Sequence, residues 1–127
     1  MSEFLQSSLY PAKVNLSYLE DIAGGSNEFI IEMIQMFLDQ TPGYLEMIKS
    51  GIEQKNWKVV SDTAHKIKPT LAFMGSNEAK EAMAGIEMDA RNLNDLDKIG
   101  ATFGDLRIFC LQLCAELQIV KETLPKD

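Results

Sequence analysis

The sequence predicts an all-α protein, an antiparallel up-down four-helix bundle with a short extra helix at its N-terminal end. Apolar residues recur at alternating intervals of three and four over four long segments, which is the period of a helix with one buried face. The segments are joined by short polar loops, so successive helices are expected to run antiparallel. We expect the 127 residues to form a single domain whose core covers about residues 16–124.

The first two helices are predicted on either side of the Gly24-Gly25 pair. A short helix over residues 16–23 ends at these glycines, and Ser26 is placed to cap the N-terminus of the next helix. The apolar spacing of that helix continues through Pro42. We therefore expect one long, kinked helix over residues 27–54.

Three further helices follow along the chain. One covers residues 57–74 and ends at Gly75, and Ser76 can then cap a helix over residues 77–92. The last helix, over residues 94–124, has the most regular pattern in the sequence. Its apolar positions, separated by three or four residues throughout, are Leu96, Ile99, Phe103, Leu106, Cys110, Leu113, Leu117, Val120 and Leu124.

Composition and charge exclude several classes of function. The formal net charge is −7 and the basic residues are dispersed, so we expect no nucleic acid partner. Apolar runs are too short to cross a bilayer and the first residues lack an export signal, so we expect no membrane partner and a cytoplasmic location. Cys110 and Cys114 share one helix face and are expected to be core residues rather than a disulfide or metal ligands.

His65 is the only histidine in the chain and lies on the helix predicted over residues 57–74. At 100° per residue it falls about 140° from Val60, away from the predicted core face. On this geometry its surface neighbours are Ser61, Lys68, Pro69 and Ala72. Because most of these side chains are short, the imidazole ring is expected to be open to a partner.

The surroundings of His65 limit the chemistry that it can perform. A metal site needs several ligands that do not converge on this face, and hydrolysis needs an oxyanion hole that amides in the middle of a helix cannot supply. A neutral imidazole is a competent nucleophile near pH 7 and can accept a phosphoryl group. Lys68, three residues on, can stabilise the added negative charge, and Lys66 contributes further positive charge.

The stretch "AHKIKPTLAFMG" resembles the signature of histidine-containing phosphotransfer (HPt) domains, which is Ala-His-x-Leu-Lys-Gly with a further glycine ten positions after the histidine. Ala64, His65, Lys68 and Gly75 match this signature, and Ile67 replaces its leucine. The resemblance implies a four-helix bundle in a two-component phosphorelay. It implies that His65 accepts the phosphoryl group, that Lys68 supports it and that Gly75 forms the turn that ends the helix.

Two features bear on how a partner would dock. Pro69 stands where the family usually has glycine; it adds bulk beside His65, lacks an N–H, and is expected to bend the helix locally. Met33 and Met36 widen the apolar arc of the helix before it, and these methionines are candidates for partner contacts near His65. The alternative is that the short N-terminal helix covers this excess of apolar surface.

The resemblance implies that the partners are response-regulator receiver domains, one of which can belong to a hybrid sensor kinase. The receiver would supply the divalent cation, so we expect no resident metal or cofactor. The chain has no Walker A motif or nucleotide loop, so we expect a phosphotransfer intermediate without its own kinase or ATPase activity. We also expect a freestanding monomer. The competing hypothesis is a helical adaptor or dimerisation module, which the regular pattern of the last helix favours.

Overall fold

Five helices make up residues 15–125, the part of the chain that this computed structural model describes. They are α2 (Ser17–Ala23), α3 (Asn27–Glu53), α4 (Trp57–Phe73), α5 (Asn77–Asn92) and α6 (Leu96–Thr123). This range contains no strand, so the predicted all-α class is confirmed. None of these helices is long and apolar enough to cross a bilayer.

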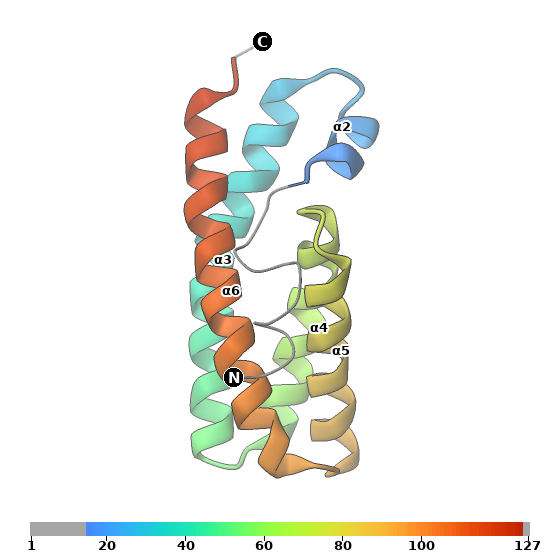
Figure 1. Ribbon diagram of the computed structural model, residues 1–127, viewed down its shortest axis with the longest axis vertical. Coiled ribbons are helices and arrows are strands. Elements are labelled where there is room, and N and C mark those ends of the chain that lie inside the picture. The colour runs from blue at the N-terminus through green and yellow to red at the C-terminus, as the bar shows by residue number, and fades with distance from the viewer. Residues whose placement is uncertain (1–14, 126–127) are drawn as a thin grey trace.

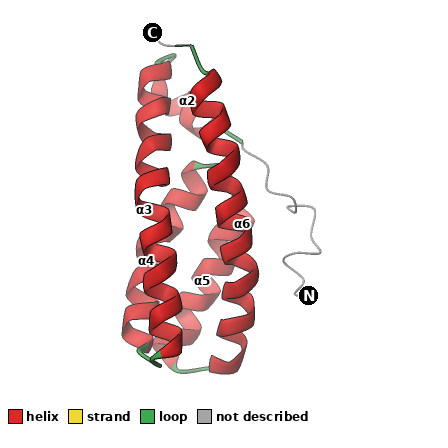
Figure 2. Cartoon of the chain, turned by 90° about the vertical axis from the view of Figure 1, so that its left-hand side faces the viewer, coloured by secondary structure: helices red, strands yellow, loops and turns green. Residues whose placement is uncertain are grey.

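Four of the helices form the bundle, and each runs antiparallel to the next (Figure 1). α3 packs against α4, α4 against α5, and α5 against α6, and α6 closes the ring by packing against α3. α3 and α6 have 27 and 28 residues, whereas α4 and α5 have 17 and 16. The longer pair therefore extends past the shorter pair at one end of the bundle, where α2 lies against α3 (Figure 2).

The ends and prolines of the helices test the predictions made from single residues. The Ser26 hydroxyl accepts a hydrogen bond from the Phe29 amide at 3.2 Å, which confirms the predicted N-cap of α3. α3 continues through Pro42 as one helix, as predicted, and α4 likewise continues through Pro69. Ser76 stands at the N-cap of α5, but its buried hydroxyl has no hydrogen-bond partner among the described residues. The predicted capping bond of Ser76 is therefore wrong.

The core of the bundle takes apolar side chains from all five helices. Phe37 and Ile48 of α3, Ile67 of α4, Met83 of α5 and Phe109 of α6 are each at most 2% exposed. Cys110 is buried in the core as predicted, and Cys114 is half-buried. Burial raises the pKa of the Cys110 thiol to about 12 and that of Cys114 to about 11, so both stay protonated near neutral pH.

Candidate functional site

His65 lies near the middle of α4 with its side chain 68% exposed. The opposite face of this helix is buried in the core through Val60, Ala64, Ile67 and Leu71. This division follows from helical periodicity, because residues separated by three and four positions share one face and His65 falls outside that set. The predicted exposure of the histidine is therefore confirmed.

Glu87 of α5 fixes the orientation of the His65 ring. The Nδ1 atom of His65 lies 2.9 Å from Oε2 of Glu87, whose side chain is only 3% exposed. An ionised carboxylate can only accept a hydrogen bond, so Nδ1 carries the proton and donates it. The Nε2 atom of the neutral ring is then left with a free lone pair.

The same carboxylate also contacts two further basic side chains. Lys68 Nζ contacts Oε1 of Glu87, and a guanidinium nitrogen of Arg91 contacts Oε2. Burial acting alone raises the pKa of Glu87, but the hydrogen bonds from Lys68 and His65 outweigh burial and hold this pKa below its usual value. Glu87 is therefore ionised near neutral pH and is the centre of a network of one acid and three basic side chains.

Sequence reasoning missed Glu87, although the chain carries a signal for it. Glu87 lies four residues after Met83 and three before Ala90, both of which are buried on the face of α5 that packs in the bundle. Burying a carboxylate at such a position costs free energy unless a basic group is paired with it. The sequence predicted Lys68 beside an anion on the imidazole, and in the structure the anion that Lys68 contacts is Glu87. Lys66 is exposed.

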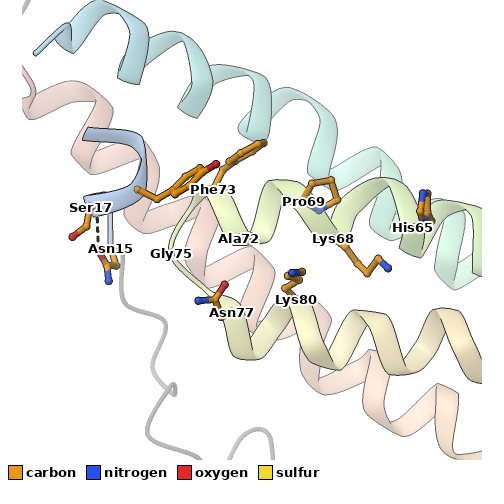
Figure 3. Close-up of a pocket in the computed structure, with 11 residues that line it drawn as sticks. Asn15, Ser17, His65, Lys68, Pro69, Ala72, Phe73, Gly75, Asn77 and Lys80 are labelled. Atoms are coloured by element: carbon orange, nitrogen blue, oxygen red, sulfur yellow. Dashed lines mark hydrogen bonds between the residues drawn. The ribbon is translucent and has the colours of Figure 1, made fainter. Parts of the chain in front are cut away.

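An open groove of about 530 Å³ begins at His65 and runs along α4 toward α2 (Figure 3). Pro69, Ala72 and Phe73 form an apolar wall of the groove, and the ring of Tyr18 stacks on Phe73 with centroids 5.5 Å apart. The full set of lining residues is Asn15, Ser17, Tyr18, His65, Lys68, Pro69, Ala72, Phe73, Gly75, Asn77 and Lys80. The groove thus joins His65 to an apolar surface on which another protein can pack.

Ser61 does not lie on the surface beside His65, and this part of the prediction is wrong. Ser61 is 5% exposed because α5 packs against the flank of α4 and widens the buried arc beyond the face that periodicity indicates. Lys68 is drawn toward α5 for the same reason, and its side chain is 22% exposed. Ala72, by contrast, is half-buried and lines the groove.

Met33 and Met36 lie on α3, away from the lining of the groove. They border a smaller hollow of about 100 Å³ between α3 and α4, to which Thr70 and Phe73 also contribute. Met36 is 50% exposed, whereas Met33 is half-buried. Phe73 borders both hollows, so the two methionines remain predicted partner contacts on the neighbouring surface.

Gly75 forms the turn that the resemblance implied. Its amide donates to the Ala72 carbonyl at 3.0 Å and the Ser76 amide donates to the Leu71 carbonyl at 3.0 Å, which is the Schellman pattern of a helix C-terminus. Gly75 has a φ of +84°, and a Cβ at this position would collide with the backbone oxygen of Asn15. Both the turn and the close approach of the chain therefore require glycine.

These features define a class of protein: a helical bundle that presents one exposed histidine, oriented by a buried glutamate, at the end of a groove. The model of the Hpt domain family matches residues 32–123, so the chain belongs to this family. Hpt domains carry out histidine phosphotransfer in phosphorelays and interact with the receiver domains of two-component systems. No curated protein and no solved structure was found to match the chain.

Proposed function

We propose that His65 accepts a phosphoryl group on Nε2 from the aspartyl phosphate of one receiver domain and passes it to the aspartate of another. The observation that carries this proposal is the hydrogen bond of 2.9 Å between His65 Nδ1 and the buried Glu87 carboxylate. It leaves the Nε2 lone pair free for attack on phosphorus. An exposed histidine without such a partner would interconvert between tautomers and point in several directions.

The transfer step balances without a further reactant. The Nε2 lone pair forms a bond to phosphorus while the bond between phosphorus and the aspartyl oxygen breaks and leaves the receiver carboxylate. The proton on Nδ1 stays on the ring, which becomes positively charged. Glu87 stabilises this charge because its carboxylate already accepts that proton in a hydrogen bond. Transfer to the second receiver is the reverse of the same step.

Lys68 is the residue that we assign to the phosphoryl group. It lies one helical turn after His65, and its side chain both contacts Glu87 and lines the groove. Its ammonium can therefore turn from Glu87 toward a phosphoryl group on Nε2, while Arg91 continues to hold the Glu87 carboxylate. Lys66, which is exposed, adds positive charge to the same surface at longer range.

The groove beside His65 is the proposed docking surface for the receiver. Pro69, Ala72 and Phe73 supply apolar area next to the nucleophile, and Lys68 and Lys80 supply positive charge along its edge. In this proposal the receiver brings the divalent cation and the acidic pocket that holds it, and the donor receiver belongs to a hybrid sensor kinase. The domain acts as a monomer, since one chain contains His65, Glu87 and Lys68.

The proposal is tested by mixing the full chain with a phosphorylated receiver domain and Mg²⁺. We expect a phosphate on the protein that is labile in acid and stable in alkali, and its loss in His65→Gln. Because the chain has a single histidine, no other imidazole can accept the label. Lys66→Gln is the matched control, since this substitution on the same helix removes an exposed side chain and should keep labelling within about threefold.

Absence of label on a folded wild-type chain, with a panel of receivers, would contradict the proposal and favour a helical adaptor. One observation supports that second function. Ile108, Leu111 and Ile119 on the outer face of α6 are 45%, 44% and 54% exposed. Sedimentation equilibrium of Leu111→Glu against the wild type separates the two, because only an adaptor that pairs through α6 changes its assembly state on this substitution.

A further inference from the structure

The groove beside His65 covers only one side of this residue. The other residues that line it all lie toward α2, and Gly75 at its far end is about 15 Å from His65 along the helix axis (Figure 3). A receiver that transfers a phosphoryl group has to lie over His65, so its footprint extends in both directions. A standard interface buries about 800 Å² on each partner, which is a disc about 30 Å across. The groove therefore accounts for about half of that width.

A second hollow lies on the opposite side of His65, between α4 and α5. This Trp57 hollow has a volume of about 300 Å³ and is lined by Trp57, Lys58, Ser61, Asp62, Ala90, Arg91 and Leu93. Arg91 joins it to the site, because its guanidinium also contacts the Glu87 carboxylate that orients His65. The groove and the Trp57 hollow together extend over about 27 Å of α4, with His65 near the middle. This length matches the width of a standard interface.

Leu93 in the Trp57 hollow is exposed although its backbone is strained. It ends α5 in the left-handed conformation, with a φ of +55°, and it is 63% exposed. At the ends of α2 and α4 the residues with positive φ are glycines, Gly24 and Gly75. A leucine in this conformation costs free energy, because its Cβ crowds the following carbonyl oxygen. The small burial of Leu93 within the chain does little to offset this cost, which indicates a contact with another molecule.

The charges around the Trp57 hollow define the chemistry of that molecule. Lys58 and Arg91 are exposed and Asp62 is the acid beside them, paired with Lys58 at 2.9 Å. The rim is therefore positively charged overall, although the formal net charge of the chain is −7. Leu93 and the half-buried Trp57 ring supply apolar and aromatic surface between these charges. The hollow thus complements an apolar side chain with acidic groups beside it.

We propose that the Trp57 hollow is the second half of the receiver-docking surface, in which Leu93 and Trp57 contact an apolar side chain of the receiver and Lys58 and Arg91 face acidic groups. This inference rests on the proposed function, because its occupant is the receiver that phosphorylates His65. Leu93 lies six residues after Glu87, or about 9 Å along α5, so it takes no part in the chemistry. It sets the receiver concentration needed for transfer and leaves the rate in the bound complex unchanged.

The contact is tested by fluorine NMR of the full chain. Trp57 is the only tryptophan, so a chain grown with 5-fluorotryptophan gives one signal, which reports on the Trp57 hollow. The titrant is an unlabelled receiver that phosphorylates the wild-type chain. We expect the Trp57 signal to move on addition of this receiver and to move less, at the same receiver concentration, in Leu93→Gly.

The role of Leu93 is tested by single-turnover phosphotransfer at increasing receiver concentration. Leu93→Gly removes the side chain and fits the left-handed backbone, so the urea concentration at the midpoint of unfolding should not fall. The receiver concentration for half-maximal transfer should rise by about fivefold or more, and the maximal rate should stay within about twofold. Leu93→Met should keep both values. Lys55→Gly is the matched control, because Lys55 also has a φ of +55° and is exposed, but it does not line the hollow.

The outcomes separate this inference from the proposed function. If Leu93→Gly needs no more receiver than Lys55→Gly, or if the Trp57 signal stays in place while phosphate is transferred, the inference is overturned and the proposed function stands. A lower urea midpoint with an equal loss of transfer at every receiver concentration would also overturn it, since Leu93 would then be structural. If no receiver phosphorylates the wild-type chain, the proposed function is contradicted and the inference fails with it.

Discussion

The interface between α4 and α5 differs in composition from the buried face of α6. All the buried residues of α6 are apolar or cysteine: Ile99, Phe103, Leu106, Phe109, Cys110, Leu113 and Leu117. The buried residues of α4 include Ser61 and Thr63, and those of α5 include Glu87. The exposed His65 lies on α4, and it contacts the Glu87 carboxylate that is buried at the α4–α5 interface.

This difference separates stability from chemistry within one bundle. The apolar face of α6 stabilises the fold through burial and close packing. The α4–α5 interface gives up some of that apolar area to hold Glu87, which costs free energy unless the carboxylate is paired. Glu87 is paired with His65, Lys68 and Arg91, and the contact with His65 orients the imidazole ring. Substitutions in the buried face of α6 should therefore mainly lower the free energy of unfolding. Substitutions in the network around Glu87 should mainly slow phosphotransfer.

The largest expected effect is on stability, from Leu113→Ala in α6. Leu113 is fully buried, so the substitution removes apolar contacts and leaves a cavity. We expect the free energy of unfolding in urea to fall by about 3 kcal/mol. Phosphotransfer per folded molecule should stay within about twofold, since Leu113 does not belong to the His65 network. A loss of transfer in molecules that remain folded would remove the distinction between the two regions.

The next effect is on phosphotransfer, from Lys68→Met. This substitution keeps the length of the side chain but removes the ammonium that contacts Glu87 and faces the groove. We expect the transfer rate to fall by about 10- to 100-fold, the effect of losing one stabilising charge in a transition state. Lys66→Met is the matched control at an exposed position and should slow transfer by less than about threefold. Equal losses in both variants would mean that only the total charge of the surface matters.

A smaller effect is expected from Glu87→Gln. The amide oxygen can still accept the hydrogen bond from His65 Nδ1, but the negative charge that stabilises the positively charged ring is lost. We expect transfer to slow by about 3- to 10-fold, with a loss of about 1 kcal/mol in the free energy of unfolding. Glu81→Gln is the control, because Glu81 is exposed on the same helix. If Glu87→Gln transferred phosphate at the wild-type rate, orientation of the His65 ring would be enough for transfer and the negative charge would not be needed.

The smallest effect is the pH dependence of the stability that Glu87 contributes. Its pKa is below the usual value of 4.5 in the folded chain, so its stabilising contribution is complete above that value and is lost as the pH falls through the folded pKa. The difference in unfolding free energy between wild type and Glu87→Gln should therefore shrink as the pH falls below 4.5. Urea unfolding of both chains at pH 5 and pH 3.5 measures it. A difference that does not shrink between these two values would contradict the lowered pKa.

Sequence reasoning recovered most of the fold because the bundle is encoded locally. The spacing of Ile30, Ile34 and Phe37, and of their counterparts in α4 and α6, places each apolar residue on the buried face where the structure has it. The ends of the helices followed from single residues such as Ser26 and Gly75. The capping bond predicted for Ser76 was wrong, because its position at a turn does not determine whether its side chain is buried.

For the site, the sequence by itself determined that His65 lies outside the buried face of its helix and that Lys68 follows one turn later. These properties depend only on the rotation per residue within one helix. Only the tertiary structure decided that Glu87 meets Nδ1, that Ser61 is buried and that Asn15 packs on Gly75. Each of these contacts depends on which helix or segment packs against a given side of α4. Periodicity places a residue on one face of its own helix, but it does not determine which neighbour covers that face.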